Sequence, residues 1–466
     1  MESLLFKCWQ ETKKTWRIAG PAILASVFQF SIGFVTAAFA GHLGSVQLAA
    51  VSVSQNVTEG FAYGILLGMG SALETLCGQA VGAGQLRILG VYMQRSWVIT
   101  LATAVVLTPL YVFTAPILRL LHQPSDISEV AGKFCIWVIP QLFAYALNFP
   151  LQKFFQSQRK VWAITAISGT VLAFHILLNW IFVVKLDHGL LAAAMVGNAS
   201  WWLIVFAQMI YLLSGCFPDS WTGFSALAFQ NLSSFLKLSL ASAIMLCLEL
   251  WYYSAVIIMV GYLRNPDIAV SAISISMNYQ IWTLMIALGF YVAVSVRVSN
   301  ELGANRPKAA KFSIAIIVTT STFFGVIFMA IAFIFRQQLP KFFTDEPDVI
   351  REASKLGYFL GALILLNSIQ PVLSGVAIGA GWQTSVAFLN TACYYLFGLP
   401  FGAILGFTLK LNELGIWIGM LCGTLLQTAI LLVITFRTEW HKEATKAEER
   451  VREWEGGIEL SSAPQH

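Results

Sequence analysis

The sequence is poor in charged residues, which make up only 11% of its 466 positions. A soluble protein carries roughly 25%, so a chain with this little charge and 58% hydrophobic residues is expected in a lipid bilayer. The apolar runs are long and lack the alternation of a membrane barrel. Helices are therefore the expected spanning elements, because each one satisfies its own backbone hydrogen bonds in lipid. The length leaves room for about a dozen spans of roughly 20 residues.

Cysteine is also scarce, and its arrangement excludes several chemistries. The seven residues form no CxxC pair, and most of them fall in the expected spans, where they serve as small apolar side chains. The sequence shows no phosphate-binding loop, no metal-ligand spacing and no nucleophile elbow. It therefore predicts no enzyme, no cofactor and no metal site.

The chain contains a long internal repeat. Residues 82–84 (Gly-Ala-Gly) and 303–305 (Gly-Ala-Asn) both follow apolar stretches and lie 221 residues apart, and the same shift relates Pro150 to Pro371. We interpret residues 82–84 as a helix stop at the membrane surface. Each proline removes a helix hydrogen bond, so paired bends are expected in the two halves. Duplication in an apolar chain is typical of transporters built from two lobes around a shared site.

The apolar runs place six spans in each half. They lie near 19–41, 48–76, 90–115, 132–156, 160–184 and 190–214, and near 235–261, 268–298, 310–335, 355–378, 383–408 and 415–436. The resulting domains are an N-terminal segment (1–18), an N-lobe (19–214), an interlobe loop (215–234), a C-lobe (235–436) and a tail (437–466).

Lysine and arginine predict the orientation. With twelve spans both termini share one side, and 19 of the 28 Lys and Arg residues fall on that side. Both termini, the interlobe loop and the tail are therefore expected in the cytosol. The same bias accounts for the net charge of +5, which is no indication of a nucleic-acid partner. Residues 1–17 are polar and charged, so no cleavable signal peptide is visible.

One acid lies in the middle of an expected span. Glu249 has no Lys or Arg within a helical turn, and charge is costly in the bilayer core. Burial favours the neutral form of a carboxyl group, so Glu249 is expected to bind and release a proton. The alternative is a permanently protonated side chain that only bridges two helices. Asn278, Tyr279 and Gln280, in the next span, are the expected hydrogen-bond partners.

Other polar side chains recur inside the spans at helical spacing and predict a water-filled substrate cavity. In the second span Gln55, Asn56, Glu59 and Tyr63 share one face of the helix. For Glu59 a structural role and a place in the cavity wall are equally plausible from the sequence. The fifth span adds His175 and Asn179, four residues apart; we interpret His175 as a packing residue, with a proton carrier as the alternative. The cavity candidates are Gln55, Asn56, Glu59, Tyr63, Gln141, Tyr145, Asn148, Gln152, Gln156, Asn367, Gln370, Ser374, Asn390 and Tyr394, with Trp251, Tyr252 and Trp282 as aromatic wall residues.

Three further segments are distinctive: 72–80 (ALETLCGQA), 295–303 (SVRVSNELG) and 370–377 (QPVLSGVA). Through these segments the chain resembles the multidrug and toxic compound extrusion (MATE) family over nearly its whole length, and together they are similar to the plant detoxification branch. Residues 247–253 (CLELWYY) resemble most the vacuolar flavonoid transporters of that branch. The resemblance implies twelve helices in two lobes with pseudo-twofold symmetry, and cation-coupled export of organic solutes. Protons are the usual coupling ion of eukaryotic members, and the family's acid in the seventh helix falls on Glu249.

Three acids found in relatives are replaced in this chain. The positions that match an Asp in the first helix of bacterial members, a second acid of animal members and an acid of the tenth helix hold Thr36, Ser254 and Asn367. Coupling would therefore depend on Glu249.

The expected function is a secondary antiporter. It would export small organic solutes, either flavonoid-like secondary metabolites or cationic xenobiotics, from the cytosol in exchange for protons. Sodium coupling and a passive anion channel of the same fold remain as alternatives, whereas a membrane enzyme is disfavoured. We expect a multi-pass monomer in the lipid bilayer of the vacuole or the plasma membrane.

Overall fold

The computed structural model describes residues 4–263 and 266–462. Within these ranges the chain is all-helical and contains no strand, which confirms the predicted fold class. Eleven helices in the described ranges are long and apolar enough to cross a membrane. A further pair, Ser125–Trp137 and Ile139–Ser157, passes the same test together and meets at 51°. Counted as one span, this bent pair brings the number to the expected twelve.

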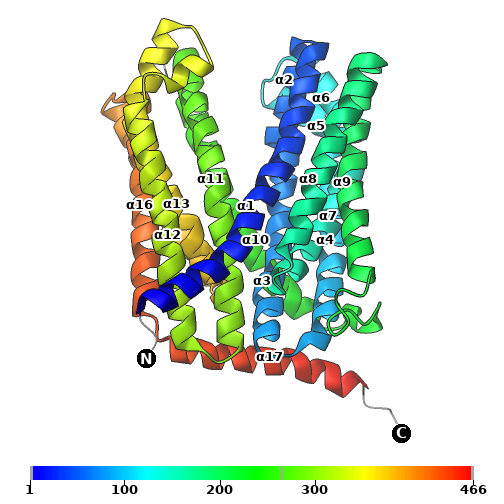
Figure 1. Cartoon of the computed structure of the whole chain (residues 1–466). Coiled ribbons are helices and arrows are strands. Elements are labelled where there is room, and N and C mark those ends of the chain that lie inside the picture. The colour runs from blue at the N-terminus through cyan, green and yellow to red at the C-terminus, as the bar shows by residue number, and fades with distance from the viewer. Residues whose placement is uncertain (1–3, 264–265, 463–466) are drawn as a thin grey trace. The chain divides into compact units, whose positions relative to one another are not determined.

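The helices belong to two compact units. The C-terminal unit consists of Met1–Ile23 and Ile244–Lys446, and the N-terminal unit consists of Leu24–Ala243 and Ala447–His466. Three helices labelled in Figure 1 begin in one unit and end in the other: α1 (Leu4–Leu43), α10 (Leu232–Gly261) and α17 (Trp440–Ser462). The predicted ranges of the lobes and cytosolic segments depend on where the membrane lies, and they stay a prediction.

The N-terminal unit contains helices α2 to α9. Their bounds are α2 Ser45–Val53, α3 Gly60–Gly82, α4 Leu89–Val112, α5 Thr114–Leu120, α6 Ser125–Trp137, α7 Ile139–Ser157, α8 Val161–Asn179 and α9 Gly189–Leu213. Two π-helical turns, Ser54–Glu59 and Trp180–Lys185, continue α2 and α8. Such turns often occur at functional sites, because they turn a side chain out of the regular helical register.

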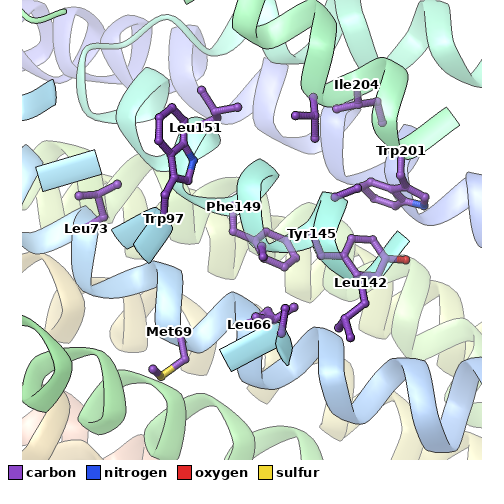
Figure 2. Close-up of a cluster of buried hydrophobic side chains, with 14 of the residues drawn as sticks. Leu66, Met69, Leu73, Trp97, Leu142, Tyr145, Phe149, Leu151, Trp201 and Ile204 are labelled. Carbon is purple, nitrogen blue, oxygen red and sulfur yellow. The ribbon is translucent and has the colours of Figure 1, made fainter. Parts of the chain in front are cut away.

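Helices α3, α4, α7 and α9 form the core of the N-terminal unit. Figure 2 shows Leu66, Leu142, Tyr145, Phe149 and Trp201 turned toward one another, and all five side chains are buried. The backbones of α3 and α10 come close, because a Cβ atom on Gly68 would lie 2.4 Å from the Cα of Ala243. Only glycine leaves room for this crossing, and its lack of a side chain lets the first part of α10 pack directly on α3.

The C-terminal unit contains helices α11 to α16. Their bounds are α11 Pro266–Gly303, α12 Pro307–Ile334, α13 Pro347–Ala380, α14 Gln383–Asn390, α15 Leu399–Ala403 and α16 Asn412–Arg437. The π-helical turns Thr391–Gly398 and Ile404–Thr408 flank α15. Helices α12 and α13 pack closely, since the hydroxyl of Ser321 donates to the carbonyl of Ser368 over 2.6 Å.

The internal repeat of the sequence is visible in the helix ends. Helix α3 ends at Gly82 and α11 ends at Gly303, which confirms the predicted helix stop. Two residues further on, Gly84 has a φ of 77° and Asn305 a φ of 54°. Glycine and asparagine are the residues that tolerate this left-handed conformation, so both halves turn the chain in the same way. Pro150 and Pro371, also related by the repeat, both lie inside helices, α7 and α13.

The tail contains an amphipathic helix, α17, that the apolar runs did not reveal. Its buried residues in the described part are Trp440, Glu443, Ala444, Ala447 and Val451, which recur every three or four positions. In the C-terminal unit Glu443 accepts a hydrogen bond from the indole of Trp382 (2.9 Å). In the N-terminal unit Trp454 packs edge-on against Tyr92 and Phe235.

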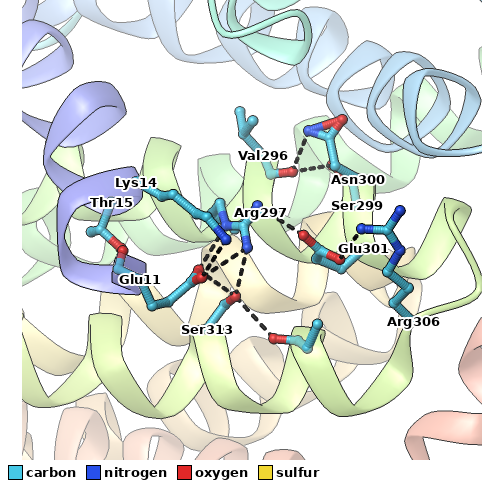
Figure 3. Close-up of polar contacts among 11 residues, drawn as sticks. Glu11, Lys14, Thr15, Val296, Arg297, Ser299, Asn300, Glu301, Arg306 and Ser313 are labelled. Carbon is cyan, nitrogen blue, oxygen red and sulfur yellow. Dashed lines mark hydrogen bonds and ion pairs between the residues drawn. The ribbon is translucent and has the colours of Figure 1, made fainter. Parts of the chain in front are cut away.

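A charged network in the C-terminal unit ties the start of α1 to α11 and α12 (Figure 3). The guanidinium of Arg297 donates to both carboxylate oxygens of Glu11, at 2.8 and 3.1 Å, and pairs with Glu301 at 2.8 Å. The hydroxyl of Ser313 donates to Glu11 over 2.7 Å. Arg297, Glu11 and Glu301 are all buried. A bidentate arginine pair of this kind fixes orientation as well as charge.

The N-terminal unit has its own buried ion pair, between Glu74 of α3 and Lys153 of α7. Both side chains are only 5% exposed. Glu74 and Arg297 belong to two of the segments that carry the family resemblance, 72–80 and 295–303. Each of these two segments thus contributes a charged residue to a buried ion pair of its own unit.

Candidate functional site

Glu249 lies on the part of α10 that belongs to the C-terminal unit. Its Oε1 atom accepts hydrogen bonds from the hydroxyl of Ser374 on α13 (2.8 Å) and from the amide of Asn390, the last residue of α14 (3.2 Å). Within the described residues no Lys, Arg or His forms an ion pair with it. The carboxylate thus meets neutral donors from two other helices.

The donors around Glu249 are themselves held in place. Asn390 donates to the carbonyl of Met245 (3.1 Å) and accepts from the side-chain amide of Gln427 on α16 (3.0 Å). Ser374 accepts from the amide of Gln370, one turn earlier on α13 (3.1 Å). A continuous polar chain therefore runs from Gln370 through Ser374, Glu249 and Asn390 to Gln427 inside one unit.

The three residues expected to bond Glu249 from the next span have other partners. Asn278 is exposed and donates to the carbonyl of Ser274 (2.9 Å), and Tyr279 donates to the carbonyl of Leu339 (2.9 Å). Gln280 is buried and interacts with Tyr253. Direct bonding of all three to Glu249 is wrong for the described structure, because consecutive helical residues point about 100° apart. An effect of these residues on coupling stays a prediction.

Tyr253 links a second pair of predicted residues in the C-terminal unit. Its hydroxyl donates to Asn367 Oδ1 over 3.0 Å, and Asn367 is buried on α13. The family resemblance matches Asn367 to an acid of the tenth helix. In this chain the position therefore binds a neutral tyrosine hydroxyl.

The predicted aromatic wall residues divide into buried and exposed sets. Tyr252 and Tyr394 stack with ring centroids 4.4 Å apart, and both are buried. The hydroxyl of Tyr252 also donates to the carbonyl of Met420 (3.2 Å). Trp251 and Trp282 are exposed. In this conformation the two tyrosines are therefore core residues of the C-terminal unit.

The predicted cavity residues of the N-terminal unit also differ in exposure. Asn56 is exposed, and Gln55 donates to the carbonyl of Gly33 on α1 (3.1 Å). Asn148 is fully buried and its Oδ1 accepts from Gln152 (3.1 Å) and Gln208 (2.9 Å). Asn148, on the polar face of α7, thus bonds to Gln208 of α9, and nothing in the sequence linked these two residues.

His175 is surrounded by partners. Its ring nitrogens contact Thr36 (3.0 Å), Ser200 (2.7 Å) and Asn179 (3.1 Å), and the side chain is completely buried. The structure supports the interpretation of His175 as a packing residue. Thr36, which stands where bacterial relatives have an acid, is part of this neutral cluster.

Glu59 is the second acid that lies inside a span. It ends the π-helical turn Ser54–Glu59, is 7% exposed, and accepts a hydrogen bond from the amide of Gln141 on α7 (3.1 Å). The same amide contacts the hydroxyl of Tyr145. The structure thus brings together three of the predicted residues of the N-terminal unit.

Comparison with known proteins identifies the fold and the family. A family model described as MatE matches the chain twice, at residues 21–181 and 241–404. The chain belongs to the MatE family. The two matches fall on the two halves of the repeat, which explains why the sequence resembles itself.

Relatives in the MatE family cover almost the whole chain. Protein DETOXIFICATION 29 of Arabidopsis thaliana is 54% identical over 96% of this chain and 90% of its own length. Protein DETOXIFICATION 33 of the same plant is 53% identical over 96% of this chain and 92% of its own length. As a MatE protein of this branch, the chain is a multi-pass membrane protein and a multidrug or toxic compound efflux transporter. Members are transporters and not enzymes.

Solved structures of MatE proteins share the fold. The crystal structure of the eukaryotic MATE transporter AtDTX14 has a TM-score of 0.91 and 33% identity, over 95% of this chain and 99% of that chain. The bent form of the Vibrio cholerae MATE transporter VcmN has a TM-score of 0.78 and 16% identity, over 96% and 99%. At that identity the bacterial protein supports the fold alone.

Proposed function

We propose that the protein is a proton-coupled antiporter that exports organic solutes from the cytosol, with Glu249 as the group that binds the coupling proton. The observation that carries this proposal is the set of contacts to Glu249: two neutral donors, Ser374 and Asn390, and no cation among the described residues. A proton can neutralise such a carboxylate without breaking an ion pair.

The orientation of the donors favours a proton over sodium. Asn390 is held by Met245 and Gln427 so that its NH₂ group, and not its oxygen, faces Glu249. The hydroxyl of Ser374 also directs its hydrogen toward the carboxylate. A hard cation such as sodium needs several oxygen ligands, whereas these groups present hydrogens.

Protonation would reverse one of these bonds. A protonated carboxyl group donates a hydrogen bond, and the NH₂ group of Asn390 cannot accept one. The hydroxyl of Ser374 can rotate and accept it. Ser374 lies three residues after Pro371, where α13 lacks one backbone hydrogen bond. We infer that the proton on Glu249 acts on α13 through Ser374.

The solutes and the membrane are also part of the proposal. The relatives are named as detoxification proteins of a plant, which supports flavonoid-like secondary metabolites or cationic xenobiotics as solutes. The exposed indoles of Trp251 and Trp282 would stack on aromatic solutes. We propose a monomer in the vacuolar or plasma membrane, with both termini in the cytosol.

Proteoliposomes that contain the purified full chain test the coupling ion. Ethidium and a flavonoid glycoside are offered under a pH gradient at equal sodium, under a sodium gradient at equal pH, and with neither gradient. Accumulation above equilibrium is expected only with the pH gradient. Accumulation driven by sodium alone would instead establish sodium coupling. An anion current with no uphill movement would establish a channel.

Replacement of Ser374 by alanine is expected to shift the pH profile of transport toward alkaline values. The change removes a hydrogen-bond donor from the charged form of Glu249, so release of the proton requires a higher pH. Initial rates of solute exchange, measured against pH, check this expectation. Ser354→Ala serves as the matched control, because Ser354 lies on the same helix and its hydroxyl donates to the carbonyl of Ile350 in its own helix. An unshifted profile in Ser374→Ala would exclude Ser374 from the proton response.

A further inference from the structure

The N-terminal unit contains a buried carboxyl group that the proposed mechanism does not use. Glu59 accepts one hydrogen bond at Oε2, from Gln141. Its other oxygen, Oε1, is buried and has no hydrogen-bond partner among the described residues. An anionic oxygen buried in this way lacks the compensation that a buried charge requires.

The titratable groups that face Glu59 are all neutral. They come from three helices: Tyr111 of α4, Cys135 of α6 and Tyr145 of α7, each close enough to interact electrostatically with the carboxylate. Helix α2 has no titratable residue, and the nearest one on α3 is Tyr63, which packs against Tyr145 at 5.3 Å. In the described part of the chain no basic side chain pairs with Glu59. The charge of Glu59 therefore has nothing to balance it inside the unit.

The surroundings of Glu59 also provide a place for a proton. The hydroxyl of Tyr111 is buried without a hydrogen-bond partner in the described residues, as is Glu59 Oε1. A proton on Glu59 would remove the charge and supply a donor to this region. On the other side, Tyr145 is fixed by Tyr63, Phe149 and Trp201, with ring centroids 5.3, 6.1 and 4.7 Å away (Figure 2 shows the last two). This aromatic cluster holds the Gln141–Tyr145 pair in position.

We propose that Glu59 is a second proton-binding group, so that each unit carries one proton and each transported solute exchanges for two. This inference rests on the proposed proton coupling at Glu249. Glu59 and Glu249 have similar surroundings. Each accepts a hydrogen bond from a side-chain amide of another helix in its own unit, and neither has a basic partner among the described residues. Glu59 adds driving force to a transport cycle whose coupling to the proton gradient requires Glu249.

Transport stoichiometry tests the proposal. Proteoliposomes with the full chain are held at zero membrane potential with a pH gradient of about one unit, and the limiting accumulation of ethidium is measured. With two protons per solute the limit is about 100-fold, and with one it is about tenfold, because each proton contributes one factor of ten. Glu59→Gln is expected to lower the limit about tenfold while uphill transport continues.

Controls separate the possible failures. Glu129→Gln, an exposed acid of the same unit, is expected to leave the limit unchanged, and Glu59→Asp to keep it near the wild-type value. A wild-type limit near tenfold, or an unchanged limit in Glu59→Gln, would overturn the second proton site but not the coupling at Glu249. Absence of any pH-driven accumulation in the wild type would overturn the proposed function itself. A wild-type limit near tenfold overturns the proposal even when Glu59→Gln does not fold, and Glu59→Asp then supplies the second variant.

Discussion

Glu249→Gln is expected to abolish uphill transport while the protein remains folded. Glutamine has nearly the same shape and keeps an oxygen that can accept the hydrogen bonds of Ser374 and Asn390. It cannot bind or release a proton, so the access states would no longer be linked to the pH gradient. By thermodynamic linkage, proton and solute weaken each other's binding in the wild type, and the variant should lose this dependence on pH.

The measurement is solute accumulation in proteoliposomes, together with ethidium binding at several pH values. Downhill exchange in Glu249→Gln shows that the variant is folded and binds solute. Glu249→Asp, which keeps a carboxyl group on a side chain one methylene shorter, should retain accumulation at a reduced rate. Normal uphill transport by Glu249→Gln would mean that Glu249 is structural, and the proton path would then have to be sought at Glu59.

The largest loss of stability is expected from Arg297→Met. This change removes the guanidinium that pairs with both Glu11 and Glu301, and it leaves these buried acids only the longer pairs with Lys14 (3.6 Å) and Arg306 (4.0 Å). Removal of one partner from a buried ion pair typically costs about 3–5 kcal/mol. Thermal unfolding in detergent, followed by tryptophan fluorescence, should show a markedly lower Tm and a lower yield of monodisperse protein.

A compensated variant distinguishes charge from packing. When Glu11→Gln and Glu301→Gln accompany Arg297→Met, the buried charges are gone and much of the lost stability should return. Lys133→Ala removes the cation of an exposed pair with Glu129, and it should change stability by less than about 1 kcal/mol. If Arg297→Met unfolds at the wild-type temperature, the network of Figure 3 contributes little to the stability of the C-terminal unit.

Apolar runs and the internal repeat were sufficient to predict the helical membrane fold, because hydrophobic length and helix stops are local properties of the chain. Gly84 and Asn305 illustrate this, since both turn the chain where the repeat placed a helix end. Helix α17 was not predicted from the sequence. Its apolar residues, Trp440, Ala444 and Val451, form a stripe too narrow to raise the mean hydropathy of a charged tail.

The candidate site was predicted in part. Glu249 could be identified from the absence of nearby cations, and Asn390 and Gln370 from polarity inside an apolar run. Their joining into one network depends on how α10, α13 and α14 pack, which helical spacing does not specify. The same limit explains the wrong partners, because Asn278 and Tyr279 were assigned to Glu249 by proximity in sequence order, whereas they bond within their own surroundings.

The first residues of the chain belong to the C-terminal unit and the last residues belong to the N-terminal unit, and this assignment constrains folding during synthesis. Glu11 is synthesised 286 residues before Arg297. At a synthesis rate of roughly 5–20 residues per second, about 15 to 60 s pass before its partner is made. The N-terminal unit in turn includes residues from Ala447 onward. Neither unit can therefore be completed from one continuous stretch of nascent chain. Truncation within α17 would remove a packing partner of the N-terminal unit, although most of that unit is synthesised first. We therefore expect cellular quality control to recognise the N-terminal unit, and not the C-terminal unit, of such a truncated protein.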